Sequence, residues 1–460
     1  MSADSVHDER LTPMLAEGLL LCPRCDSAKT LTDRGVCLTC TACDHEVPVV
    51  SGVPDFFTGY ASDGVDPITI DMGVVTEIAT ILDLPDTDDV KTTIATALRQ
   101  AERNTDSPAL TAEIREVHAR FVGGEVDEPP LPTEANGAPT VFVQRHYAPD
   151  GFVAGERRFV NVRFENRGRE VWSSRTTPVS ITAGARFHRR SFGRTKQSKP
   201  TYTALPIDIE PGRCITLPVE VVTPSKPGRY QLELALVLHP DGFIDGGQWL
   251  EVDVHEDPTD PSVRPRPDTV VVREGVGDYG EDHRIANETV DAAIERRWPG
   301  TFRRIVEIGG GTHPQSWNHA NSMLVNVDIS APTLQLGTLY DRHHDRSIVH
   351  LCSDAMASPL APASWHVVTM YATLHHFPEP ERLLEAARQL LLPGGIVAVM
   401  CEPTGTTLAH PAGVRDLLGG INEQTFAVDE YLWMANEAGL DVVEAFDDGG
   451  SFKAILQRPV

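Results

Sequence analysis

Hydrophobic residues recur with different periods along this chain of 460 residues. From 71 to 122 they recur three or four positions apart, as at Val75, Ile78 and Leu82, which is typical of helices with one buried face. From Val160 onward apolar and polar residues alternate between turns rich in proline and glycine, which indicates antiparallel strands. From Ile305 onward short apolar runs alternate with helical stretches, the pattern of a parallel sheet.

These periods predict a multidomain α/β protein. We expect a helical adaptor at 65–124, a central antiparallel β-sandwich at 138–256 and an α/β domain with a Rossmann-like sheet at 275–460. Stretches rich in proline and acidic residues at 125–139 and 256–268 are typical of linkers. A helix is expected at 288–298, with Asn287 as its N-cap.

The α/β domain contains a glycine-rich turn between two apolar strands. The first strand ends in Gly309 and Gly311, where the backbone can approach a ligand without a Cβ in the way. The second strand ends at Asp328, nineteen positions after Gly309, and an acid at that distance can accept both hydroxyls of a ribose. A dinucleotide fingerprint needs glycine where this chain has Pro314. The pattern therefore favours an adenosyl cofactor other than a nicotinamide or flavin dinucleotide.

Cysteines cluster near the N-terminus, in a module expected at 15–58. Two C-x-x-C pairs, separated by fourteen residues, supply the four soft ligands of a structural zinc site: Cys22, Cys25, Cys40 and Cys43. A disulfide or redox role is the alternative. Cys37 is a fifth thiol, which we leave outside the metal shell.

Charge narrows the function classes. The chain has 40 basic and 66 acidic residues, a net charge of −26 and a pI near 5.0. Such a field repels phosphate backbones and disfavours general nucleic-acid binding. The N-terminus lacks the pattern of a signal peptide, and no apolar run approaches eighteen residues, so we expect a cytoplasmic protein with no membrane span.

Motifs beyond Asp328 carry a family resemblance. Asp354 follows the next strand, a Leu-His-His segment at 374–376 follows the one after, and Leu-Pro-Gly-Gly stands at 392–395. In this order, from 285 to 460, the chain resembles class I S-adenosylmethionine-dependent methyltransferases of type 11/12. Two departures are His366, where the family has an acid, and 312–321, which lacks an apolar helix face.

The resemblance implies roles for individual residues. Glu307, Gly309 and Gly311 would surround the methionine part of S-adenosylmethionine, and Asp328 would hold the ribose. The adenine would meet Asp354 and Ala355. If the acceptor is a hydroxyl, a base must take its proton. The candidates for this role are His375 and His376, and the alternative is that they only shape the wall of the site.

Two other segments carry resemblances of their own. Residues 19–57, with the sequence at 45–57 after the second cysteine pair, resemble zinc ribbons that act as methyltransferase activator subunits or precede methyltransferase domains. The segments at 160–168, 204–212 and 227–232 resemble immunoglobulin-like modules of bacterial glycan-modifying enzymes and of O-antigen transporters. Trp172, Tyr202 and Trp249 are candidates either for stacking on sugars or for packing in the core. A basic loop at 186–199 is a candidate either for binding an anionic glycan or for exposure to solvent.

These observations favour an S-adenosylmethionine-dependent methyltransferase with a structural zinc ion, which O-methylates a glycan or other small polar acceptor. We expect the segment 420–432 to contribute acceptor contacts at Asn422, Glu423 and Tyr431. The ribbon or the sandwich would serve a protein partner. The alternatives are a ribosomal RNA methyltransferase, against which the net charge of −26 and the sandwich argue, and a scaffold without catalysis.

Overall fold

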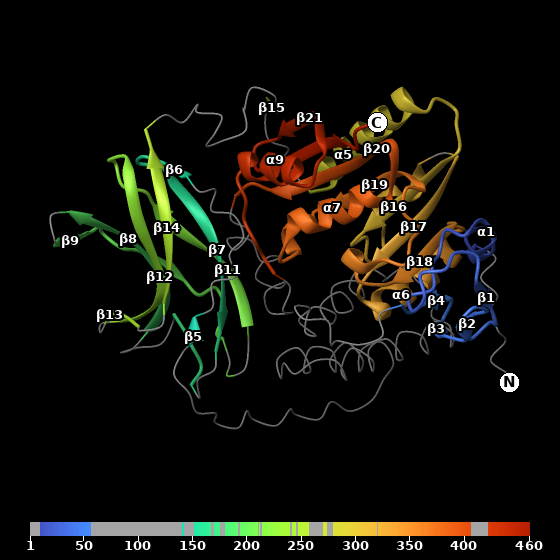
Figure 1. Ribbon diagram of the computed structural model, residues 1–460, viewed down its shortest axis with the longest axis horizontal. Helices are drawn as coiled ribbons and strands as arrows, with labels where there is room; N and C mark the ends of the chain where they lie inside the picture. The colour runs from blue at the N-terminus through green and yellow to red at the C-terminus, as the bar shows by residue number, and fades with distance from the viewer. Residues whose placement is uncertain are drawn as a thin grey trace.

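The computed structural model describes residues 10–56, 140–141, 151–405 and 422–460, apart from gaps at 167–169, 175–179, 192–193, 210, 212–213, 240–241, 245–246, 257–269, 274–278 and 320. The predicted helical adaptor at 65–124, the linker at 125–139 and all but the first residue of the linker at 256–268 lie outside the described residues. Figure 1 shows the described parts in a row, with an α/β unit between an N-terminal module and a pair of β-sheets. None of the helices within these ranges is long and apolar enough to cross a membrane.

The N-terminal module is a short helix followed by a four-stranded antiparallel sheet in the order β1-β2-β3-β4. Its elements are α1 (Leu11–Glu17), β1 (Leu31–Asp33), β2 (Cys37–Cys40), β3 (Glu46–Val50) and β4 (Val53–Pro54). Leu11, Met14 and Leu38 are buried in the same core as one face of the α/β sheet. The module therefore shares its core with the α/β unit.

The central region consists of two sheets around a common core. The larger has the order β10-β8-β12-β14-β6, with β9 on β8 and β13 on β12, and the smaller the order β11-β7-β5. Their bounds are β5 (Thr140–Val141), β6 (Gly151–Val153), β7 (Arg157–Glu165), β8 (Ser180–Ser191), β9 (Arg194–Gln197), β10 (Thr201–Ala204), β11 (Cys214–Val222), β12 (Gly228–His239), β13 (Gly242–Phe243) and β14 (Gln248–His255). The pairing differs from the all-antiparallel expectation at one place, because β6 runs parallel to β14.

One expectation within these sheets needs correction, and the alternatives for a second are narrowed. The segment 186–199, expected as a basic loop, contains the β8–β9 hairpin, in which His188 pairs with Gln197. Three of its basic side chains, those of Arg186, His188 and Arg189, have partners on β12, and His188 Nε2 lies 2.7 Å from the Glu233 carboxylate. Of the three aromatic candidates, Trp172 is 3% exposed and belongs to the core, whereas Trp249 and Tyr202 are about half exposed.

The α/β unit has a mixed eight-stranded sheet in the order β15-β21-β22-β20-β19-β16-β17-β18. The bounds are β15 (Val270–Val272), β16 (Arg303–Ile308), β17 (Ser322–Asp328), β18 (Ile348–Cys352), β19 (Trp365–Tyr371), β20 (Leu391–Pro403), β21 (Asp441–Asp447) and β22 (Ser451–Gln457). The strands β16 to β20 run parallel, and β22 is antiparallel to both of its neighbours. The sheet includes β15, which precedes the expected boundary at 275.

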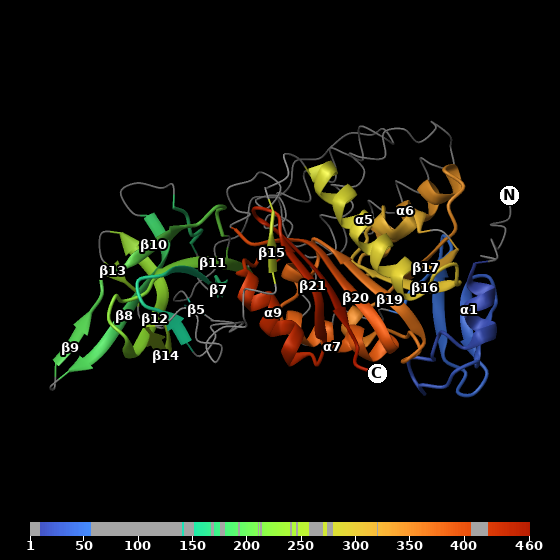
Figure 2. The same ribbon diagram turned by 90° about the horizontal axis from the view of Figure 1, so that it is seen from above.

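Helices cover both faces of this sheet (Figure 2). One face packs against α5 (Tyr279–Arg297), and the other against α7 (Pro380–Leu390) and α9 (Val428–Glu437); α6 (Ala331–His343) packs on β18. The expected N-cap at Asn287 is wrong, because α5 begins at Tyr279. The Asn287 side chain instead accepts a hydrogen bond of 2.7 Å from the Tyr371 hydroxyl.

The smaller β-sheet lies directly against the α/β unit. Alternation along β7 predicts that Asn161 faces solvent, but it is 2% exposed. Its side chain exchanges two hydrogen bonds, of 2.9 and 3.0 Å, with the backbone of Thr425. On the neighbouring strand β11, the Thr216 hydroxyl donates to Asn422 Oδ1 over 2.8 Å. Asn161 and Thr216, on the polar face of this sheet, are thus buried because residues 422–425 cover them.

A buried ion pair also stabilises the contact between the smaller β-sheet and the α/β unit. We expect Arg158→Ala to weaken this contact by about 3 kcal/mol. The Arg158 side chain, 4% exposed, lies 3.1 Å from Asp429 and 3.4 Å from Glu430, which would be left without their cation. Differential scanning calorimetry should then show the two β-sheets unfolding separately from the α/β unit. The control is Arg157→Ala on the same strand, whose exposed pair with Glu220 should matter little. Identical melting curves for both variants would contradict this role of Arg158.

Candidate active site

The glycine turn after β16 has the backbone that only glycine adopts readily. Gly309 and Gly311 have φ angles of 72° and 52°. A Cβ on Gly309 would lie 2.4 Å from Thr373 Cγ2, and one on Gly310 would lie 2.5 Å from Asn326 Oδ1. These glycines therefore let the turn pack closely against the ends of β17 and β19.

Glu307 anchors the chain that follows the glycines. Its carboxylate accepts hydrogen bonds from the backbone N–H groups of Gln315 and Ser316, over 2.7 and 2.8 Å. Burial raises the pKa of Glu307, although these hydrogen bonds oppose the shift. The contacts hold η3 (Gln315–Asn318), a single 3-10 turn. The described residues 312–319 thus follow a path without an α-helix, consistent with the lack of an apolar helix face in this segment.

Two further acids follow the next two strands. Asp328, at the end of β17, accepts hydrogen bonds from Gly311 N over 3.2 Å and from Ser330 N over 2.8 Å. Burial raises its pKa against the effect of these bonds. Asp354, after β18, accepts from Met356 N over 2.9 Å and caps η4 (Ala355–Ala357). Because β16, β17 and β18 are parallel neighbours, all the predicted cofactor residues lie together at the carboxyl ends of these strands.

A buried polar chain supports the glycine turn, and sequence reasoning did not find it. Asn326 Nδ2 donates to the Gly311 carbonyl over 2.7 Å and lies 3.1 Å from His350 Nδ1. The other ring nitrogen of His350 lies 2.8 Å from the Asp341 carboxylate. The available signal was a polar residue inside each of two otherwise apolar strands, β17 and β18.

The two candidate histidines lie on η5 (Leu374–His376), just beyond the end of β19. Glu402, which is fully buried, accepts hydrogen bonds from Thr373 N and Leu374 N over 2.8 Å each and from His375 N over 3.0 Å. The same carboxylate lies 2.8 Å from His375 Nδ1. Burial opposes ionisation of Glu402, but His375 and these hydrogen bonds outweigh it and hold its pKa below the usual value. His375 therefore has a fixed orientation.

His376 contacts the segment that docks on the β-sheets. Its Nδ1 lies 2.8 Å from the Asn422 carbonyl and 3.4 Å from Glu423 Oε1. Burial and the neighbouring His375 lower the pKa of His376. Asn422 and Glu423, expected near the acceptor, do lie beside the histidines. Tyr431 belongs to the core instead, since it is 2% exposed and stacks on Phe452.

Comparisons with known proteins agree with this arrangement. Residues 306–399 match the family model of a methyltransferase domain. The 27-O-demethylrifamycin SV methyltransferase of Amycolatopsis mediterranei is 29% identical over 184 residues, which cover 37% of this chain and 67% of that protein. The C-terminal part of the chain is a class I S-adenosylmethionine-dependent methyltransferase domain.

Other relatives match the methyltransferase domain over similar lengths. The ubiquinone biosynthesis O-methyltransferase of Idiomarina loihiensis is 27% identical over 123 residues, covering 26% of this chain and 50% of that protein. The chain thus spans between half and two thirds of the length of these two curated relatives. Among solved structures, the CurJ carbon methyltransferase is 19% identical with a TM-score of 0.33, covering 39% of this chain and 54% of that one.

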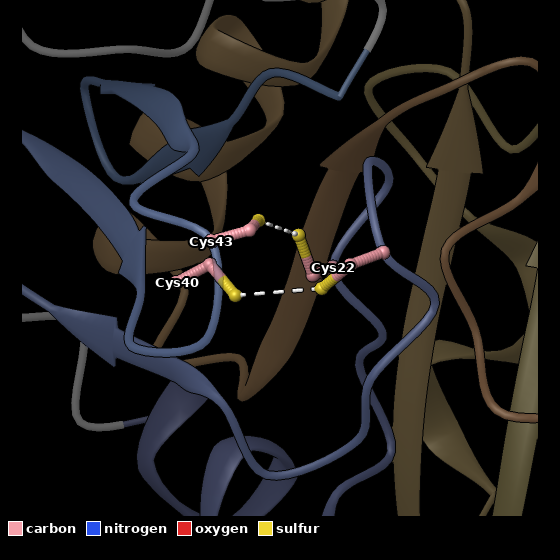
Figure 3. A group of neighbouring side chains, drawn as sticks. Cys22, Cys40 and Cys43 are labelled. Atoms are coloured by element: carbon pink, nitrogen blue, oxygen red, sulfur yellow. Dashed lines mark hydrogen bonds between the residues drawn. The ribbon is translucent and has the colours of Figure 1, made fainter.

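The four paired cysteines lie together beside the methyltransferase domain. Figure 3 shows the thiols of Cys22, Cys40 and Cys43 pointing toward one another between two loops. The sulfurs of Cys22 and Cys43 are 3.6 Å apart, and those of Cys25 and Cys40 are 3.7 Å apart. A tetrahedral zinc ion with Zn–S bonds of about 2.3 Å separates its sulfurs by about 3.8 Å. The four thiols fit such an ion, and Cys37 lies outside the group.

Proposed function

We propose that this protein uses S-adenosylmethionine to methylate a hydroxyl group of a small polar acceptor, and that the acceptor is a glycan or glycan precursor. The observation that carries the proposal is the joint placement of the acids at the ends of β16 to β18 and the histidine pair at the end of β19. The names of two relatives refer to O-linked methyl groups on small molecules. The glycan class is supported by the β-sheets, which we propose form an immunoglobulin-like sandwich.

The cofactor residues are assigned by their positions. Glu307 with the backbone of Gly309 and Gly311 would meet the methionine part, and Asp328 would accept the ribose hydroxyls. Asp354 and Ala355 would meet the adenine. The fit rests on the close turn at the glycines and on the Asp328 carboxylate 3.2 Å from Gly311 N, which places an acceptor of hydrogen bonds beside exposed backbone.

The chain's own residues would align the acceptor and assist removal of its proton. S-adenosylmethionine supplies a methyl group on a sulfonium with a good leaving group, so alignment is the main contribution of the protein. His375 and His376 are the proposed catalytic residues. Glu402 holds the Nδ1 proton of His375, so the lone pair of Nε2 is directed away from Glu402 and toward Glu423, 3.9 Å away. His376 completes the same wall.

The cysteine module would contribute stability. We propose that Cys22, Cys25, Cys40 and Cys43 hold a structural zinc ion, because a four-cysteine shell leaves no open position for catalysis. The module or the sandwich would also be the place for a protein partner. A ribosomal RNA substrate is disfavoured by the net charge of −26.

Methyl-labelled S-adenosylmethionine tests the proposed acceptor class. When the full-length protein is incubated with glycan-lipid fractions, we expect label in the glycan, identified by chromatography after acid hydrolysis. An Asp328→Ala variant should give no label and serves as the control. Label found only in protein or RNA would contradict the glycan assignment, and cofactor binding without any transfer would favour a scaffold.

A further inference from the structure

A second group of metal-binding side chains lies at the acceptor side of the methyltransferase domain. Within the described residues, one ligand atom each from His375, His376 and Glu423 lies within 4.8 Å of the others. Glu423 is 1% exposed and His375 4% exposed, while the His376 side chain is 26% exposed. The group is therefore buried on two sides and reachable on the third.

We propose that His375, His376 and Glu423 bind a divalent transition-metal ion. Glu423 Oε1 lies 3.4 Å from His376 Nδ1 and 3.9 Å from His375 Nε2. A tetrahedral ion with bonds of about 2.1 Å separates its ligands by about 3.4 Å, and an octahedral ion separates neighbouring ligands by about 3.0 Å. Small side-chain shifts would bring all three atoms onto one ion. Two imidazoles and a carboxylate are a donor set suited to zinc, iron and manganese.

The hydrogen bonds around these side chains resemble those that orient the ligands of known metal sites. A histidine that ligates through one nitrogen usually donates its other N–H to a carboxylate, which fixes the ring and strengthens it as a ligand. Glu402 does this for His375, over 2.8 Å from Nδ1, and is itself held by three backbone N–H groups. The Asn422 carbonyl accepts a hydrogen bond from His376 Nδ1 over 2.8 Å. Binding of the ion through Nδ1 would move this proton to Nε2 and leave the carbonyl as a further oxygen at the same place.

The β-sheets complete the site. Glu423 lies between Asn422, which accepts from Thr216 of β11, and Thr425, which exchanges two hydrogen bonds with Asn161 of β7. Gln424 is tied to the other side, since its amide donates to the carbonyls of His375 and Phe377 over 3.0 and 2.6 Å. The docked sheets therefore hold the carboxylate against the histidines.

The role of the ion rests on the proposed function. An ion at this place would bind an oxygen of the acceptor and make its hydroxyl more acidic. In the transfer, the hydroxyl loses its proton to water and its oxygen forms a bond to the methyl carbon. The bond from methyl to sulfur breaks, and its electron pair stays on sulfur. The histidines would then assist proton removal as ligands of the ion.

Manganese binding to the full-length protein, with its zinc retained, tests the site. Mn²⁺ prefers carboxylate and imidazole ligands to thiolates, so it separates this site from the cysteine group. Electron paramagnetic resonance of free Mn²⁺ should show one bound ion per chain, with at least tenfold weaker binding in Glu423→Gln and in the more exposed His376→Gln. The control is Glu437→Gln, an exposed carboxylate on α9. Binding that is absent, or equal in all variants, would overturn the proposal.

Methyl transfer, measured separately, distinguishes the two proposals. If the site is right and supports transfer, chelation and Glu423→Gln should each lower kcat at least tenfold, while binding of S-adenosylmethionine stays within a few-fold of the wild type. Manganese bound without transfer to any acceptor would leave the metal site standing and contradict the function. Transfer that persists with no metal bound would support the proposed function and contradict the role of the metal site.

Discussion

Asp328→Ala should weaken binding of S-adenosylmethionine at least a hundredfold. We propose that its carboxylate, at the end of β17, accepts both ribose hydroxyls, because it lies beside the glycine turn, which it contacts through Gly311 N over 3.2 Å. Each hydrogen bond to a charged group contributes about 1.5–3 kcal/mol, so two amount to about 3–6 kcal/mol. At about 1.4 kcal/mol per factor of ten, this corresponds to a hundredfold or more in Kd.

Titration calorimetry of the full-length protein measures this effect. Asp328→Asn keeps the shape of the side chain and should fall between the wild type and the alanine variant. The control is Asp441→Ala, an exposed position at the start of β21. No heat from the wild type, or unchanged binding by Asp328→Ala, would contradict the cofactor site.

The second large effect is expected from the cysteine module. Structural zinc ions contribute about 10–16 kcal/mol of apparent binding free energy to small zinc modules, and Cys40→Ser removes one of the four ligands. The module shares its core with the methyltransferase sheet, because Cys40 itself is buried there with Leu38 and Leu20. We therefore expect a loss of more than 5 kcal/mol, or a fall in Tm of roughly 10 °C or more.

Cys37→Ser is the matched control for this variant. Cys37 lies on the same strand, β2, but outside the group of four thiols. Zinc content and calorimetric Tm of both variants, compared with the wild type, decide the result. A Cys40→Ser protein that keeps one equivalent of zinc at the wild-type Tm would show that the thiols do not hold a structural ion.

The local patterns of the methyltransferase domain were predictable from the sequence. Parallel strands are buried on both faces and read as continuous apolar runs, so the strands that end near Gly309, Asp328 and Asp354 could be placed. Because such strands align their carboxyl ends, their acids could be expected together. In the structure these residues do lie together at the carboxyl ends of the parallel strands.

Contacts between distant segments were not predictable in this way. Glu402 meets His375 because β20 lies beside β19, and Glu423 meets both histidines because a later segment returns to them. The alternation of polar and apolar residues also placed Asn161 wrongly in solvent. It indicates which face of a strand is polar, but not what covers that face. In sequence, a polar residue that is hydrogen-bonded to a neighbouring unit cannot be distinguished from one that is hydrogen-bonded to water.

The N-terminal module also pairs with the carboxyl end of an edge strand. The strand β18 is the last in its sheet, and its outer backbone groups would be free to pair with another chain. Asp55 forms a parallel bridge to Cys352, and Phe56 N donates to the Cys352 carbonyl over 2.9 Å. A protein that loses this cover would expose an apolar strand edge next to the proposed cofactor residues. Aggregation through β18 would then accompany loss of activity, so the N-terminal module would also protect the protein from aggregation.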